Sequence, residues 1–198
     1  MSTLEQALKR SNKLFVDGIF IKKLTGLVKI VTDSKNSHRV EDLVDYYTKG
    51  LSNILADLGI QTDIVDNPIK SSPPFLIGSR MESPEFKTIL IYGHGDTVPL
   101  QVEEWHEGIS PSELKIINDK IYGRGVADNK GQHLINLLAL HSVLKTRKKL
   151  GFNLKIIFEM GEEIGSPGLF ELCHEYKDYF KSDVLIASDG PRVAIDVP

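Results

Sequence analysis

A histidine and an aspartate, His94 and Asp96, stand two residues apart at the end of the short apolar run 89–92. The run is rich in β-branched and aromatic residues and is followed by glycine, so it predicts a buried strand that ends in a tight turn. A neutral imidazole is a common ligand of divalent metals, and a carboxylate on its second ring nitrogen fixes its orientation. Asp96 is close enough to supply that carboxylate. Gly-His-Gly-Asp also suits an ordinary turn, so the metal interpretation requires further ligands.

Four other acidic residues stand beside predicted strand or helix ends. Glu162 and Glu163 follow one apolar run, Asp189 follows another, and Asp128 precedes a predicted helix. In open α/β sheets, ligands bind beyond the carboxyl ends of the strands, so these side chains are candidates to converge there. Each has an ordinary alternative: Asp128 as a helix cap, the glutamates as solvated loop residues and Asp189 as a turn residue.

One chemistry accounts for the acidic residues together. A pair of zinc ions about 3.5–4 Å apart needs a bridging ligand and one or two terminal nitrogen or oxygen ligands on each ion. Asp128 is the candidate bridge, with His94 and Asp189 on one ion and Glu163 on the other. One glutamate must stay off the metals, accept a proton from the bridging water and pass it to the leaving amine. Glu162 is the candidate for that role.

The elements that position these residues alternate between helix and strand. This alternation predicts an α/β fold, a three-layer sandwich around a mostly parallel central sheet. The helix that follows Asp128 is apolar around most of its circumference, so we expect it to be buried on more than one side, with His133 and His141 packing or capping. Ser166 and Pro167 are expected to cap the last helix, and the run 184–187 to be a core strand. The expected helices are one or two in 2–31, then 39–58, 130–144 and 166–179; the expected strands are 60–65, 75–81, 89–92, 154–158 and 184–187, with a hairpin in 114–122.

Bulk composition excludes several other classes of protein. The 198 residues are 41% hydrophobic and 26% charged, which is typical of a globular domain, and the net charge of -3 argues against a general nucleic-acid binder. No apolar run is long enough to cross a bilayer, and the amino terminus lacks the layout of a signal peptide. The single cysteine, Cys173, has no partner for an internal disulfide. These features predict a cytoplasmic protein without a nucleic-acid or membrane partner.

Four motifs follow one another along the chain: GHGD at 93–96, YGRGVADNKG at 122–131, GEEIGS at 161–166 and SDG at 188–190. Their order resembles the co-catalytic zinc peptidase family, which includes aminoacylase, acetylornithine deacetylase, succinyl-diaminopimelate desuccinylase, carnosine dipeptidases and bacterial glutamate carboxypeptidase. The resemblance covers nearly the whole chain and implies a zinc-exopeptidase-like fold. It also implies two divalent metal ions, with zinc as the expected metal and cobalt or manganese as alternatives.

The resemblance implies the same roles that the chemistry suggests. They are His94 as a terminal ligand, Asp96 as its orienting aspartate, Asp128 as the bridge, Glu162 as the general base, and Glu163 and Asp189 as ligands of one metal each. The implied reaction is hydrolysis of a peptide or N-acyl amide bond in a small substrate by a metal-bridged water that the glutamate activates. Both a carboxypeptidase or dipeptidase and an N-acyl-amino-acid deacylase fit these residues.

One departure from the family concerns its final histidine ligand. Family members continue into a lid and dimerisation domain and then return to the catalytic domain, which supplies that histidine; no residue of this chain corresponds to it. We therefore expect residues 1–198 to be the amino-terminal portion of the catalytic domain, with the lid and the carboxyl-terminal part absent, and the parent protein to be a homodimer through the lid. The alternatives are a truncated, non-catalytic metal-binding or interaction fragment and a metal-independent scaffold.

Overall fold

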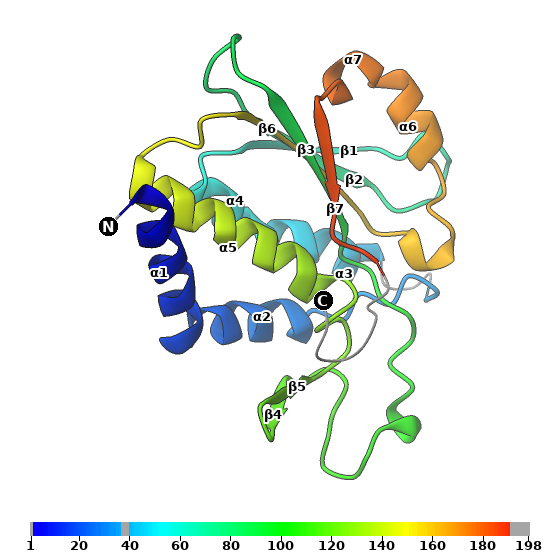
Figure 1. Ribbon diagram of the computed structural model, residues 1–198. Coiled ribbons are helices and arrows are strands. Elements are labelled where there is room, and N and C mark those ends of the chain that lie inside the picture. Colours follow the sequence, from blue (N-terminus) through cyan, green and yellow to red (C-terminus); the bar gives the residue numbers. More distant parts are fainter. Residues whose placement is uncertain (1, 37–39, 191–198) are drawn as a thin grey trace.

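A five-stranded sheet is the central layer of the structure, a computed structural model that describes residues 2–36 and 40–190 (Figure 1). The strand order is β1-β2-β6-β3-β7. β3 pairs in parallel with β6 and β7, whereas β2 runs antiparallel to β1 and β6, so only β2 opposes the other strands. The sheet is therefore mixed, with one reversed strand in the mostly parallel arrangement that was predicted. The strands are β1 (Gln61–Val65), β2 (Phe75–Arg80), β3 (Thr88–His94), β6 (Asn153–Glu159) and β7 (Val184–Ala187).

Helices cover both faces of this sheet, which confirms the predicted three-layer α/β sandwich. Helices α2 to α5 pack on one face, and α6 and α7 pack on the other, each over its own hydrophobic core (Figure 1). α1 lies against α5 and α2. Among the described residues, no helix combines the length and apolar character needed to cross a membrane. The helices are α1 (Thr3–Val16), α2 (Ile19–Lys29), α3 (Val40–Asp45), α4 (Ser52–Asp57), α5 (Lys130–Arg147), α6 (Leu169–Glu175) and α7 (Lys177–Phe180).

The side chains of β6 alternate between the two hydrophobic cores. Leu154, Ile156 and Phe158 are buried in the core beneath α2 to α5, whereas Ile157 is buried in the core beneath α6 and α7. A strand covered on both faces needs apolar residues at successive positions. This is why Ile156, Ile157 and Phe158 are successive apolar residues in β6, whereas the Lys155 side chain donates a hydrogen bond to the carbonyl of Lys181.

The helix predicted over 39–58 is not uniformly α-helical. A π-helical segment, Tyr46–Leu51, separates α3 from α4, and Tyr46 and Tyr47 are buried in it. The Tyr47 hydroxyl donates a hydrogen bond to the carbonyl of Phe158, 2.8 Å away. The segment therefore ties this helix to the end of β6 through polar groups, which the apolar periodicity does not reveal.

Two expectations near the carboxyl end of the chain are wrong. Ser166 and Pro167 do not cap α6, because this helix begins after Gly168, whose φ of 85° only glycine adopts easily. The run 184–187 is not a core strand. β7 pairs only with β3, and its residues are exposed, with Leu185 61% accessible.

The carboxyl ends of β3, β6 and β7 lie next to one another. In the parallel pairing of β3 with β6, His94 is opposite Glu159. A short 3-10 helix, Glu162–Ile164, follows β6, and Asp189 follows β7 by two residues. α5 begins two residues after Asp128. The sheet order thus brings together motifs that are far apart in the sequence.

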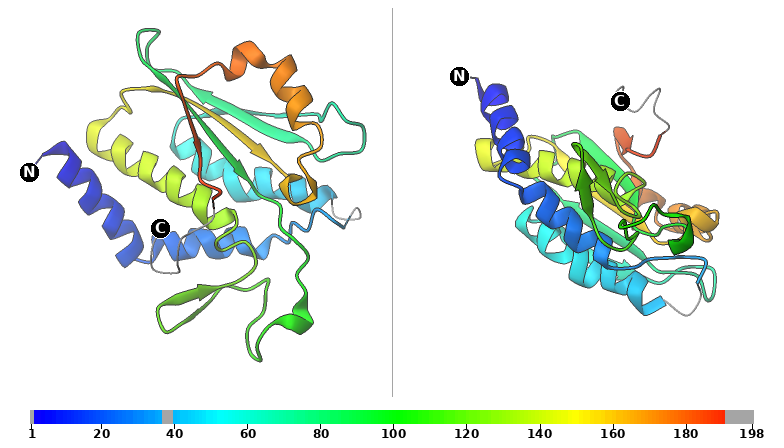
Figure 2. Two further views of the ribbon diagram at one scale, coloured as in Figure 1. Left: turned by 45° about the vertical axis from the view of Figure 1, so that its right-hand side comes forward. Right: turned by 90° about the horizontal axis from the view of Figure 1, so that it is seen from below.

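The predicted hairpin lies away from this sheet. β4 (Lys115–Ile117) and β5 (Lys120–Tyr122) pair antiparallel and form a second, two-stranded sheet. The long segment that carries them extends away from the central layer and returns to it at the start of α5 (Figure 2).

Candidate metal centre

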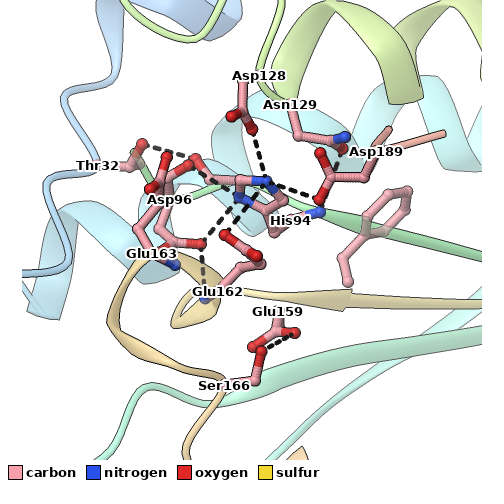
Figure 3. A network of polar contacts seen from close by, with 12 residues as sticks. Thr32, His94, Asp96, Asp128, Asn129, Glu159, Glu162, Glu163, Ser166 and Asp189 are labelled. Atoms are coloured by element: carbon pink, nitrogen blue, oxygen red, sulfur yellow. Dashed lines mark hydrogen bonds and ion pairs between the residues drawn. The ribbon is translucent and has the colours of Figure 1, made fainter. Parts of the chain in front are cut away.

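His94 is the centre of a cluster of carboxylates at the ends of the strands. Its side chain is fully buried, and its Nε2 lies 2.9 Å from Asp128 Oδ1, 3.4 Å from Asp189 Oδ2 and 3.9 Å from Glu162 Oε2 (Figure 3). These acidic residues come from three segments, which precede α5, follow β7 and follow β6. Three of the four acidic residues expected to converge therefore lie around one imidazole nitrogen.

Asp96 holds the other side of the imidazole. His94 Nδ1 lies 3.2 Å from Asp96 Oδ1, and both side chains are fully buried. The Asp96 carboxylate also accepts hydrogen bonds from the backbone N–H groups of Glu162, at 3.2 Å, and Glu163, at 3.1 Å. Asp96 thus orients the histidine and fixes the start of the 3-10 helix. The second role depends on the adjacency of β3 and β6 and was missed in the sequence.

The turn between His94 and Asp96 requires glycine because of close packing. A Cβ atom on Gly95 would lie 2.5 Å from the Tyr46 ring and 2.7 Å from the Met160 methyl group. The Gly95 carbonyl accepts a hydrogen bond of 2.6 Å from the Thr32 hydroxyl. These contacts hold the turn in one conformation.

The grouping of the glutamates differs in part from the expected roles. The candidate ligand atoms of His94, Glu162 and Asp189 lie within 4.8 Å of one another. Glu162, the expected general base, is therefore close enough to His94 and Asp189 to share one metal ion with them. The Glu163 carboxylate is not part of that three-residue group. It lies close enough to Asp128 that, after burial, the charge of Asp128 is the next largest influence raising the Glu163 pKa.

The electrostatics of the cluster favour a cation. Burial alone would lower the pKa of His94, but hydrogen bonds to Asp128 and Asp96 and the charges of Asp96 and Asp189 raise it to about 10. Burial raises the pKa of Glu162, and the charges of Asp189 and Asp128 add to that increase. Several carboxylates thus share one region with a single imidazole. A donor set of one imidazole nitrogen and several carboxylate oxygens fits zinc, and it also suits manganese or cobalt.

Asn129 is a further residue of the site that sequence reasoning missed. Its side-chain oxygen accepts a hydrogen bond of 3.3 Å from the His94 N–H and lies 3.0 Å from His133 Nδ1. Its amide nitrogen donates to the carbonyl of Ser188, 2.8 Å away. Asn129 therefore links the ends of β3, β7 and α5. Its position directly after Asp128 in the motif was the only available signal.

His133 packs beneath the site, as predicted. It is fully buried, its Nε2 lies 2.6 Å from the Tyr46 hydroxyl, and its ring contacts that of Phe158. Burial lowers the pKa of His133 to about 3, helped by the charges of His94 and Lys130. His133 is therefore a neutral residue that supports the site.

Sequence comparison identifies relatives of known activity. The sequence profile of Peptidase family M20/M25/M40 matches residues 90–195. Beta-Ala-His dipeptidase of Mus musculus is 37% identical over 137 residues, which are 68% of this chain and 27% of that protein. Cys-Gly metallodipeptidase DUG1 of Saccharomyces cerevisiae is 31% identical over 186 residues, which are 86% of this chain and 38% of that protein. The chain thus spans about a third of the length of these relatives.

Solved structures agree with this relationship. Dug1p, a di-peptidase from Saccharomyces cerevisiae, superposes with a TM-score of 0.85 at 29% identity, covering 97% of this chain and 42% of that one. Human carnosine dipeptidase 1 gives the same TM-score at 27% identity and covers 98% and 42%. The family profile, the fold and the order of the motifs lead to one conclusion: the chain belongs to peptidase family M20/M25/M40.

Proposed function

We propose that this chain carries most of the metal ligands of a metal-dependent hydrolase that cleaves a peptide bond in a small substrate, with a dipeptide as the preferred substrate class. The observation that carries the proposal is the buried imidazole of His94, which has three carboxylates within 4 Å of Nε2 and a fourth on Nδ1. The names of the relatives, Beta-Ala-His dipeptidase and Cys-Gly metallodipeptidase, favour a dipeptide over an N-acyl amino acid.

The proposed cofactor is a pair of divalent ions, with zinc expected and cobalt or manganese as alternatives. His94 and Asp189 would hold one ion, Glu163 the other, and Asp128 both. The 2.9 Å and 3.4 Å approaches of Asp128 and Asp189 to His94 support the first set. The position of Glu163 directly after Glu162 in the GEEIGS motif supports its assignment to the second ion. When bound, such ions polarise a substrate carbonyl and lower the pKa of water.

Glu162 is the proposed proton carrier. A carboxylate that takes a proton from water and returns it to the leaving amine works best with a raised pKa. Burial and the neighbouring carboxylates shift the pKa of Glu162 in that direction. The backbone N–H of Glu162 donates a hydrogen bond to Asp96, so the backbone at this position is held independently of the Glu162 side chain.

Residues 1–198 are proposed to correspond to the amino-terminal part of the catalytic domain of the longer relatives. The fraction of the relatives' length that the chain spans supports this correspondence. A final histidine ligand, a lid and a dimer contact would then belong to the whole protein. A cytoplasmic location is part of the same proposal.

The central test is Glu162→Gln in the whole protein. Hydrolysis of Cys-Gly and β-alanyl-histidine should be lost, while the zinc content per chain stays within error of the parent protein. The matched control is Glu171→Gln, an exposed glutamate on α6, which should retain both properties. Full turnover by Glu162→Gln would refute the proposed role.

A second candidate is a non-catalytic metal-binding fragment. It is favoured by the group of His94, Glu162 and Asp189, whose ligand atoms are close enough to hold a single ion. In that case the 198-residue chain would bind one ion per chain and hydrolyse neither dipeptide. Two ions per chain together with turnover would exclude it. A metal-independent scaffold would be excluded if a chelator strongly lowers the melting temperature.

A further inference from the structure

Glu159 is a buried carboxylate that the proposed chemistry does not use. It ends β6 opposite His94, and its side chain is 1% accessible. Oε1 accepts a hydrogen bond of 2.9 Å from the Ser166 hydroxyl (Figure 3). It also accepts a hydrogen bond of 2.6 Å from the Tyr92 hydroxyl. Among the described residues, Oε2 has no hydrogen-bond partner. Burial of a carboxylate with one unpaired oxygen costs free energy, and the two hydrogen bonds at Oε1 offset part of that cost.

Ser166 closes the segment that carries Glu162 and Glu163. Its backbone N–H donates to the carbonyl of Gly161, 2.7 Å away, so the ends of segment 161–166 meet. The φ of Ser166 is 53°, a left-handed conformation that costs a residue with a side chain about 1 kcal/mol. The hydroxyl bond to Glu159 holds the residue in that conformation.

The two ends of this segment are therefore held by two different buried carboxylates. Asp96 accepts the N–H groups of Glu162 and Glu163 at the start, and Glu159 accepts the hydroxyl of Ser166 at the finish. Tyr92 ties Glu159 to β3, the strand that also carries His94. The two carboxylates thus connect the segment to the strand of the histidine ligand at both ends.

We infer that Glu159 is a positioning residue, which fixes segment 161–166 by accepting the hydroxyl hydrogen bonds of Ser166 and Tyr92. Its effect on hydrolysis rests on the proposed function, because it acts through Glu162 and Glu163. Its effect on the segment does not. The role requires a hydrogen-bond acceptor rather than a charge, so glutamine at this position should hold the segment as well as glutamate does.

Hydrogen exchange in the metal-free chain tests the role directly. Glu159→Ala should speed exchange of the amides of Ile164, Gly165 and Ser166 about tenfold, the effect of losing one hydrogen bond of typical strength. Glu159→Gln should restore slow exchange, and Ser166→Ala should reproduce the Glu159→Ala effect. The matched control, Glu171→Ala on the exposed face of α6, should leave these amides unchanged.

Metal binding gives the second measurement. Glu159→Ala should weaken the binding of Co²⁺ about tenfold, as substitutions behind metal ligands do, and Glu159→Gln should bind like the parent chain.

Unchanged hydrogen exchange in Ser166→Ala overturns the inference, and this variant decides the matter if Glu159→Ala does not fold. Exchange as fast in Glu159→Gln as in Glu159→Ala overturns the acceptor role. If the parent chain binds no metal, the proposed function fails, whereas the exchange experiment still decides the role of Glu159.

Discussion

The two sides of the His94 ring differ in how tightly the structure holds them. On the Nδ1 side, Asp96 is fully buried and accepts hydrogen bonds from two backbone N–H groups. On the Nε2 side, the Asp128 and Glu162 side chains are 65% and 38% accessible. The buried side is pre-organised by the fold, whereas the open side keeps its carboxylates free to adapt to a ligand. The buried carboxylate would therefore orient the histidine, whereas the exposed carboxylates would contact a bound metal ion.

The largest expected effect is on the buried side. Asp96→Ala would leave two backbone N–H groups without an acceptor and remove the partner of His94, so we expect a loss of about 3 kcal/mol in the free energy of unfolding. Denaturant titration of the metal-free chain measures it. Asp128→Ala is the control from the open side and should change stability by less than about 1 kcal/mol. Equal losses in the two variants would contradict the comparison.

Metal should stabilise the chain through the open side. At a free Zn²⁺ concentration about 100 times the dissociation constant, the free energy of unfolding should rise by about 2.7 kcal/mol. Thermal unfolding with and without a chelator measures this shift. Asp128→Ala should reduce it even though this variant folds normally. A full shift in Asp128→Ala would remove Asp128 from the ligand set.

The pH dependence of stability should distinguish a structural carboxylate from those of the site. Burial alone would raise the pKa of Glu82, but hydrogen bonds from the N–H groups of Leu150 and Gly151 and from Arg80 lower it. Its stabilisation is therefore present above the unfolded-state pKa and is lost as the pH falls through the lower folded-state pKa. Glu82→Gln should cost about 1–2 kcal/mol at pH 7, and the cost should shrink below about pH 4.5.

Glu162→Gln should show the opposite sign in the same metal-free measurement. Burial and neighbouring carboxylates raise the Glu162 pKa, so its ionisation opposes folding at neutral pH. Because this side chain is partly exposed, the variant should gain only a few tenths of a kcal/mol at pH 7. The gain should disappear as the pH falls toward the unfolded-state pKa. A loss of stability at pH 7 would show that Glu162 is structural.

The smallest effect is expected on β7, the exposed edge that leads to Asp189. Leu185→Thr removes a largely accessible side chain, so the free energy of unfolding should change by less than about 0.5 kcal/mol. Zn²⁺ affinity should also stay unchanged. A large loss in either quantity would mean that the edge is as firmly held as the buried side of His94.

The positions of the proposed ligands at the ends of the elements could be predicted from the sequence because each one lies beside a local signal. His94 and Asp189 follow the apolar runs of β3 and β7, and Asp128 precedes a helix that is apolar around most of its circumference. The carboxyl ends of parallel strands meet at one edge of a sheet, so these local signals are enough to assemble the cluster. The three-layer architecture follows from the same alternation of strands and helices.

The supporting contacts could not be predicted because they join residues far apart in the sequence. The bond from the Glu162 N–H to Asp96 spans 66 residues and exists only because β3 and β6 are neighbours. The local pattern at Ser166 suggested a helix cap, but its hydroxyl donates a hydrogen bond to Glu159 instead. At Ser166 a tertiary hydrogen bond prevails over a local preference, and sequence periodicity carries no information about either contact.

The pairing of His94 with Glu159 ties the site to the lengths of two strands. Because successive side chains of a strand point to opposite faces, inserting or deleting one residue in β3 or β6 would turn the imidazole or the carboxylate to the wrong face. Natural variants of this chain should therefore differ in these strands by substitution alone. Changes in chain length should accumulate in the segment between β3 and α5, where the hairpin lies outside the central layer.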